Sequence, residues 1–309
     1  MDNLISRSHK SLGQNPYGYV PELAAGIAYV VCFAILTILH LGLAIRYRYW
    51  IVLCTLVPGE KLITPTVEII GWAGRLWSHY DISGINPFIM QICCLILGPA
   101  FFSAWAYTLL GYCITRLGPG YSLLKPKMYI AVFVTADVIS LVLQAIGGGG
   151  AAVAAEDGND TKKSTKIMLA GILFQLATMT IFVALSLDFI VRVLTHRPWR
   201  QEIISEPEVS NNGENVALKT IANRNGHNAS TTSTDQYLLA GVAFASLMIF
   251  VRGIYRSVEL AQGWSGYVIS HEPFFIWLDG FPMVLCLAGL AVAHPGWLLP
   301  PQVSGWKMT

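Results

Sequence analysis

Charged residues are scarce in this sequence of 309 residues. Asp, Glu, Lys and Arg make up 12% of it, whereas hydrophobic residues make up 54%. Ordinary soluble domains carry about 25% charged residues, so the composition excludes this class and predicts an integral membrane protein. The net charge of +2 is also too small for a nucleic-acid-binding protein, and we expect no nucleic-acid partner.

Enzyme signatures are missing as well. The sequence contains no HExxH, no GxSxG and no GxxxxGK[ST] phosphate loop, so ATP hydrolysis by this chain is not expected. All six cysteines fall within apolar segments, where they pack as small apolar residues, and the seven histidines are dispersed. We therefore expect no enzyme activity, no cofactor and no metal site.

Apolar runs long enough to cross about 30 Å of hydrocarbon recur along the chain. An apolar run in lipid must pair its own backbone groups, and the alternating pattern of barrel strands is absent, so each run is predicted to be a helix. The predicted fold is all-α, a polytopic membrane protein with a seven-transmembrane helix bundle. The spans cover residues 23–45, 50–74, 87–113, 128–150, 166–191, 237–257 and 271–293.

Lys and Arg are unevenly distributed between the connections. They are more numerous after the first, third and fifth spans than on the opposite side, which predicts that those connections are cytosolic. The tail at 1–22 is then extracellular, whereas the loop at 192–236, read as disordered, and the tail at 294–309 are cytosolic. No cleavable signal is recognised, and the first span is expected to direct insertion. Asn159, in the sequon Asn159-Asp160-Thr161, is the glycosylation candidate.

Ionisable and amide side chains interrupt the predicted spans. Each charge at the centre of a membrane helix costs roughly 2.5–3.5 kcal/mol, so these residues need partners or water. Glu68 and Arg75 lie about 10.5 Å apart along one helix, too far for direct pairing. The predicted helix directions bring the whole set to similar depths towards the outer leaflet. Its members are Glu68, Arg75, Gln91, Asp137, Gln144, Gln175, Arg252, Arg256, Glu259, Glu272 and Asp279.

Two interpretations of this set stay open. The residues line a shared polar cavity that opens towards the outer leaflet, or they form an ion-pair network that only fixes the bundle. The acids outnumber the arginines by five to three, which favours a cationic head group or a protonated carboxyl. Asp188 and Arg192, four residues apart, are instead interpreted as a solvated pair at a helix end.

Several motifs occur along the spans in a fixed order. Each of spans two to seven contains polar, charged or glycine residues at characteristic spacings, and a final motif follows span seven. In chain order the motifs are Glu68-Ile-Ile-Gly71-Trp-Ala-Gly-Arg75, Gly98-Pro99-Ala100, Asp137 with Ser140 and Gln144, Gly171 with Gln175, Arg252-Gly-Ile-Tyr255-Arg256-Ser-Val-Glu259, His271-Glu272 with Asp279, and His294-Pro295-Gly296.

With these motifs the sequence resembles the fungal lipid-translocating exporters, seven-span proteins associated with aminocholesterol resistance and with release of sphingoid long-chain bases. The resemblance implies a transporter of lipid-like amphiphiles, such as sphingoid bases, sterol amines or toxic amphiphilic compounds, that confers export or resistance. The expected location is the plasma membrane. It carries over no catalytic residue. The oligomeric state stays open.

A seven-transmembrane receptor, or a sensor of lipids or stress, is the alternative function. It has the same span count and orientation. The end of span three reads Ile114-Thr115-Arg116 without an acidic-Arg-aromatic triplet, and span seven lacks Asn-Pro-x-x-Tyr. These absences favour the transporter.

Overall fold

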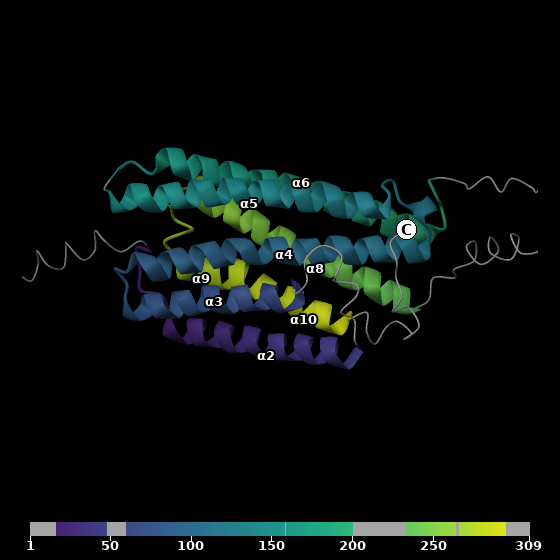
Figure 1. Cartoon of the computed structure of the whole chain (residues 1–309), viewed down its shortest axis with the longest axis horizontal. Helices are drawn as coiled ribbons and strands as arrows, with labels where there is room; N and C mark the ends of the chain where they lie inside the picture. Colours follow the sequence, from purple (N-terminus) through teal and green to yellow (C-terminus); the bar gives the residue numbers. More distant parts are fainter. Residues whose placement is uncertain (1–16, 48–59, 158, 200–232, 264–265, 295–309) are drawn as a thin grey trace, which may run out of the picture.

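The computed structural model describes residues 17–47, 60–157, 159–199, 233–263 and 266–294. Within these ranges the regular elements are all helical, and the long helices run along one common axis (Figure 1). They are α2 (Leu23–Tyr47), α3 (Glu60–Tyr80), α4 (Ile85–Leu117), α5 (Pro126–Glu156), α6 (Lys162–Thr195), α8 (Ser233–Ala261), and a last rod formed by α9 (Glu272–Phe275), η3 (Ile276–Gly280) and α10 (Phe281–Val292). The short η2 (Pro119–Tyr121) lies between α4 and α5.

The fold is that of an all-α polytopic membrane protein, as predicted. Six of the rods are long and apolar enough to cross a membrane. Helix α3 is the seventh rod, and its charged residues lower its hydropathy. It continues past the predicted end of the second span at 74 to Tyr80, because Arg75 is buried and paired inside the bundle. Most of the predicted start of that span, 50–59, lies outside the described residues.

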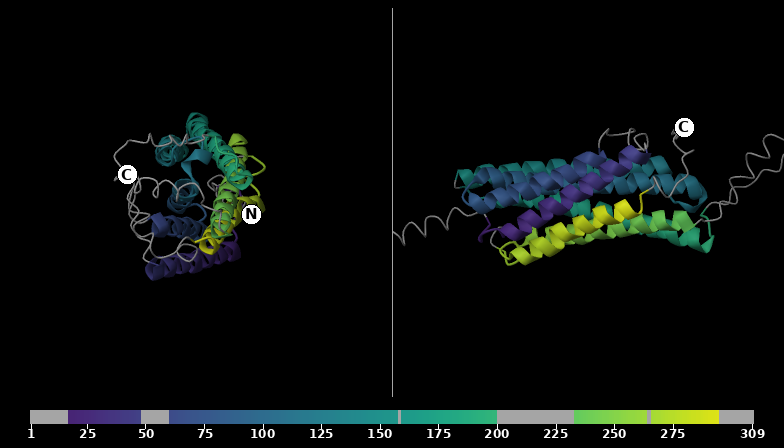
Figure 2. Two further views of the ribbon diagram at one scale, coloured as in Figure 1. Left: turned by 90° about the vertical axis from the view of Figure 1, so that its right-hand side faces the viewer. Right: turned by 90° about the horizontal axis from the view of Figure 1, so that it is seen from below.

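The helices pack mainly against their neighbours in the chain. Helix α2 packs against α3, α3 against α4, α4 against α5, and α5 against α6. Helix α8 then returns through the bundle and contacts α4, α6 and α10. In Figure 1, α2 and α6 lie on opposite edges with α4 between them, and the end-on view in Figure 2 shows the same separation. Helices α4 and α8 are therefore placed to hold buried side chains.

Aromatic side chains fill the space between α4, α5 and α6. The Tyr107 ring lies 4.5 Å from that of Phe182 and 5.4 Å from that of Phe133, measured between centroids. The outward faces carry exposed apolar residues such as Val132 and Val191. Since lipid tails are as apolar as these side chains, packing and polar contacts, rather than the hydrophobic effect, hold the helices together.

Glycines allow α5 and α6 to approach closely. A Cβ atom at Gly147 would lie 2.7 Å from the Cα atom of Met168, and one at Gly171 would lie 2.9 Å from the carbonyl oxygen of Ser140. Both neighbours are backbone atoms, which cannot move without shifting a helix. By contrast, Gly149 has no atom within 4 Å of that position.

Gly147→Ala is therefore expected to destabilise the protein by about 1–3 kcal/mol, because the added methyl group overpacks the contact between α5 and α6. The measurement is thermal unfolding of the purified protein in detergent. Gly149→Ala is the matched control on the same helix and is expected to keep or slightly raise the melting temperature. Equal melting temperatures for the two variants would contradict the close-packing assignment.

Candidate functional site

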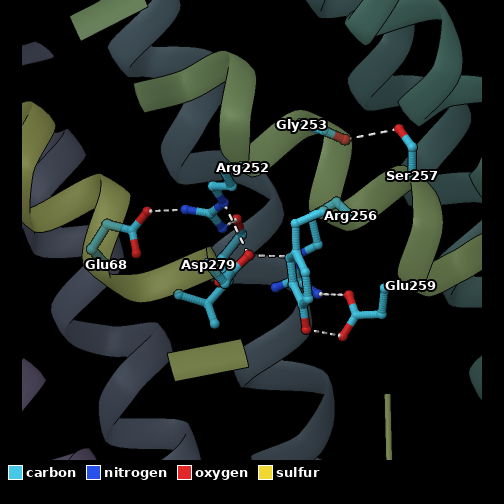
Figure 3. Close-up of polar contacts among 9 residues, drawn as sticks. Glu68, Arg252, Gly253, Arg256, Ser257, Glu259 and Asp279 are labelled. Atoms are coloured by element: carbon cyan, nitrogen blue, oxygen red, sulfur yellow. Dashed lines mark hydrogen bonds and ion pairs between the residues drawn. The ribbon is translucent and has the colours of Figure 1, made fainter. Parts of the chain in front are cut away.

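Arg252, on α8, lies at the centre of a buried ion network (Figure 3). Its Nη1 atom is 2.9 Å from Oε1 of Glu68 on α3, and its Nε atom is 3.1 Å from Oδ1 of Asp279 in η3. The Nη2 group donates a hydrogen bond to the carbonyl oxygen of Leu95 on α4. Each of the three charged side chains is at most 2% exposed. One guanidinium thus joins α3, α4, α8 and the last rod.

Arg256, one turn further along α8, extends the network. Its Nε atom donates to Oδ1 of Asp279 at 2.6 Å, and its Nη1 atom donates to Oε2 of Glu259 at 2.9 Å. The hydroxyl of Tyr255 donates to the other oxygen of Glu259 at 2.8 Å. Three carboxylates, those of Glu68, Glu259 and Asp279, therefore face two guanidinium groups. When all five are ionised, the network carries one excess negative charge.

The backbone around Asp279 is unusual. Residues Ile276–Gly280 form a π-helical turn inside the last rod, a feature that is frequent at functional sites. The hydroxyl of Tyr29 donates to the Ile276 carbonyl oxygen at 2.7 Å. Gly280 is required here because a Cβ atom would lie 2.9 Å from the Tyr29 ring and would also overlap Trp72. Gly280, together with the aromatic rings of Tyr29 and Trp72, therefore fixes the backbone that carries the Asp279 carboxylate.

A second ion pair lies nearer one end of the bundle. Arg75 Nη2 is 2.7 Å from Oε1 of Glu272 and also donates to the hydroxyl of Tyr19 at 2.8 Å. The backbone N–H of Glu22 donates to both carboxylate oxygens of Glu272, at 2.8 and 3.0 Å. We call residues 17–22 the N-terminal strap. The strap ties α3 to the start of the last rod.

Tyr17 anchors the other end of this strap. Its hydroxyl donates to Oε1 of Gln91 on α4 at 2.9 Å and lies 2.8 Å from the Ser78 hydroxyl on α3. Burial raises the pKa of Tyr17 to about 12, so the hydroxyl stays protonated at neutral pH and keeps donating. Gln91 is thereby used to hold the strap.

A small cavity, here called the chamber, lies between α4, α5, α6 and α8 and is lined by both apolar and polar side chains. Its volume is about 90 Å³. Gln144 Nε2 on α5 donates to Gln175 Oε1 on α6 at 2.9 Å across one side of it. Its polar lining consists of Ser103, Gln144, Gln175, Arg252, Arg256 and Glu259. Three of these residues, Arg252, Arg256 and Glu259, lie on α8 and also belong to the network, so the chamber and the network share them.

An apolar cavity of about 550 Å³, here called the groove, lies beside the chamber between α4 and α5. The two cavities share Ile92, Ile96 and Gln144 in their linings. Leu97 and Val153, which also line the groove, are exposed on the face of the bundle. A cavity with six polar side chains in its wall thus adjoins an apolar cavity that opens on the lipid-facing surface.

Comparison with known proteins assigns the family. Residues 62–302 match the model described as RTA1 like protein. The chain belongs to the RTA1-like family. The resemblance drawn from the motifs is therefore confirmed at this level.

Three relatives of this RTA1-like protein are from Saccharomyces cerevisiae. Sphingoid long-chain base transporter RSB1 is 31% identical over 312 residues, covering 94% of this chain and 76% of the relative. Protein RTA1 is 27% identical, covering 90% of this chain and 84% of the relative. Protoporphyrin uptake protein 1 is 26% identical, with coverages of 89% and 90%. No solved structure matches the chain.

The structure brings together most of the site residues predicted from the sequence. Five form the network, Gln144 and Gln175 line the adjoining chamber, and Arg75 pairs with Glu272. The prediction that Glu68 and Arg75 find separate partners is confirmed. Asp137 stands apart from the network, with its Oδ2 atom accepting a hydrogen bond from Tyr107 at 3.0 Å. The functional roles of all these residues stay predictions.

Two further expectations concern residues outside this cluster. Asp188 and Arg192 form the predicted pair at the end of α6, 2.9 Å apart, and Trp199 donates to the same carboxylate at 2.8 Å. Asn159 is exposed in the connection between α5 and α6, and its glycosylation stays a prediction. A second sequon, Asn228-Ala229-Ser230, is expected on the cytosolic side and lies outside the described residues.

Tyrosine hydroxyls are the part of the site that sequence reasoning missed. Tyr255 precedes Glu259 by four residues, so helical spacing alone could have placed them together. Tyr19 reaches Arg75 from the strap, across 56 positions of sequence, and no local pattern reveals that contact. The Leu95 carbonyl oxygen is a backbone group whose partner no side-chain pattern could show.

Arg252→Gln is expected to lower the free energy of unfolding by about 3–5 kcal/mol, because Glu68 and Asp279 lose a buried counter-charge. The added substitution Glu68→Gln should recover part of this loss. Thermal unfolding of the purified variants measures the effect. Asp188→Asn, which removes a partly exposed pair, is the control and should cost less than about 1 kcal/mol. Equal losses for Arg252→Gln and Asp188→Asn would rule out a stabilising network.

Proposed function

We propose that this RTA1-like protein moves a cationic amphiphile across the membrane, with the polar head in the chamber and the hydrocarbon chain in the groove. The observation that carries the proposal is the contact between a cavity with three charged side chains in its wall and an apolar cavity. Single-chain amines, sphingoid bases and sterol amines have this chemistry. Export of such compounds, and resistance to toxic ones, is the cellular role that follows.

The charge of the network favours a positive head group. Three carboxylates and two guanidinium groups leave one negative charge in excess in the network as a whole. At the chamber wall lie Glu259, Arg252 and Arg256, and both arginines are already paired with carboxylates. A protonated amine entering the chamber would balance this charge. The side-chain amides of Gln144 and Gln175 supply neutral hydrogen-bonding groups opposite α8. An anionic head group would instead add to the excess.

The two volumes favour a small head and a long apolar tail. The chamber, at about 90 Å³, has room for a few water molecules or a compact amino-alcohol group. The groove, at about 550 Å³, lies within the range of ligand pockets and is lined mainly by apolar side chains. Because the groove opens on the surface that faces lipid, a substrate could enter from the bilayer without passing through water.

The names of the relatives agree with this chemistry. Sphingoid long-chain base transporter RSB1 is named for an amphiphile with an amino head group, and the alignment covers most of this chain. We further propose the plasma membrane as the location, with the N-terminal strap on the extracellular side, as the Lys and Arg distribution indicates. The network then lies in the outer half of the bilayer. The same relatives support a transporter rather than an enzyme.

Glu259→Gln is expected to weaken binding of a long-chain primary amine by roughly tenfold or more, since a charge-assisted hydrogen bond is worth about 1.5–3 kcal/mol. The measurement is equilibrium binding to the purified protein in lipid nanodiscs. The alcohol with the same hydrocarbon chain is the control ligand, and its binding should not change. Equal weakening of both ligands would show a structural effect and would contradict recognition of the cation.

Ala145→Phe is expected to reduce transport of the same amine in liposomes several-fold, because the new ring fills part of the groove. Ala131→Phe is the matched control, an exposed alanine on the same helix that does not line the groove. Both variants are compared at equal amounts of reconstituted protein. Equal transport by Ala145→Phe and the wild type would exclude the groove as the site of the hydrocarbon chain.

A further inference from the structure

Asp137, on α5, is buried without a cation. It is 3% exposed, and its Oδ2 atom accepts a hydrogen bond from the Tyr107 hydroxyl at 3.0 Å. The Oδ1 atom is buried and has no hydrogen-bond partner among the described residues. The residue precedes Gln144 by about 10 Å along α5 and lies near the middle of the helix. A carboxyl group therefore sits deep in the bundle with half of its hydrogen-bonding capacity unused.

Six other acids in the described helices differ in this respect. Glu68, Glu259, Glu272 and Asp279 each pair with an arginine, as do Asp188 and Asp235. No Lys, Arg or His in the described ranges forms an ion pair with Asp137. An isolated carboxylate in such surroundings is much less stable than the neutral acid. Asp137 is thus suited to hold a proton.

The recorded partner of this carboxyl comes from α4, and that partner is in turn packed by α6. Helix α4 contributes the Tyr107 hydroxyl, and α6 places the Met179 sulfur 3.8 Å from that hydroxyl and the Phe182 ring against the Tyr107 ring. On α5 itself, Ser140 donates to the backbone carbonyl oxygen of Asp137 and not to its carboxyl group. Tyr107 is the titratable group recorded in contact with Asp137 in this part of the structure. No neighbouring charge substitutes for a proton there.

Tyr107 connects Asp137 to the chamber. Met179, against which its hydroxyl lies, forms part of the chamber wall. Ser103, one turn earlier on α4, also lines the chamber and interacts with the same hydroxyl. Asp137 is therefore separated from the chamber by the Tyr107 hydroxyl and by Ser103 in the wall. A tyrosine hydroxyl can give its proton to one neighbour while it accepts a proton from another.

We infer that Asp137 is a proton-binding site of this protein and that Tyr107 and Ser103 pass the proton between the carboxyl and water in the chamber. In the observed arrangement the Tyr107 hydroxyl donates to Oδ2. On uptake, the Tyr107 O–H bond breaks and its proton bonds to Oδ2, the Ser103 hydroxyl gives its proton to the Tyr107 oxygen, and the Ser103 oxygen takes a proton from water. Release is the reverse. No other reactant is needed.

The use of this proton depends on the proposed function. A cation in the chamber favours the ionised carboxylate, so entry of an amine promotes release of the proton from Asp137. By linkage, a bound proton weakens binding of the amine to the same extent. A proton gradient could then drive export without ATP, for which the chain has no phosphate loop.

Infrared spectroscopy of the purified protein in nanodiscs tests the proton site directly. The wild type should show the C=O stretch of a protonated carboxyl at neutral pH, and Asp137→Asn should remove that band. Tyr107→Phe keeps the ring and should shift the band, because it removes the hydrogen bond to Oδ2. Asp188→Asn is the control and should leave the band unchanged. A band unaffected by both Asp137→Asn and Tyr107→Phe would overturn the assignment.

Amine transport in liposomes with and without a pH gradient tests the coupling. Wild-type transport should respond to the gradient, whereas transport by Asp137→Asn should not. Coupling is contradicted if both respond equally. If the wild type moves no amphiphile while Asp137→Asn still removes the infrared band, the proposed function fails and the proton site stands. If the wild type transports the amine and Asp137→Asn leaves the infrared band unchanged, the proposed function stands and the proton site fails.

Discussion

The pairing of Arg252 with Glu68 and Asp279 is the contact on which the rest of this structure depends. A membrane offers these side chains no water, and each would be costly to bury alone. By meeting one another, they join α3, α8 and the last rod, while the bond to the Leu95 carbonyl adds α4. Helices with apolar exteriors gain little from burying one another in lipid, so such a contact fixes their arrangement.

The same network also creates a compartment with a preferred charge. A purely structural salt bridge needs only one acid for each base, but here Glu259 adds a third carboxylate to two arginines. That carboxylate lines the chamber, and the chamber adjoins the apolar groove. Stability and binding are therefore compatible uses of one cluster, and the two interpretations drawn from the sequence are not exclusive.

Much of the fold could be predicted from hydropathy, because a helix that crosses lipid must be a long apolar segment. The need of Glu68 and Arg75 for separate partners also followed from helix geometry. Other features depend on three-dimensional packing. The π-helical turn at Asp279 has no clear sequence pattern, and the contact of Tyr19 with Arg75 joins distant segments. Asp137 and Gln144 lie seven residues apart on α5, so the sequence predicts that they share one helix face. Their partners nevertheless differ, Tyr107 for Asp137 and Gln175 for Gln144, and the sequence alone could not show this.

Photo-crosslinking with a long-chain amine that carries a photoreactive group at the end of its tail tests most directly whether the groove and chamber act together. Mass spectrometry of the labelled protein then locates the tail. Labelling should concentrate on groove residues such as Leu97 and Ala145, and the matched alcohol should label them weakly. Labelling spread along exposed residues of α2 and α6, with no difference between amine and alcohol, would contradict a binding site formed by the network.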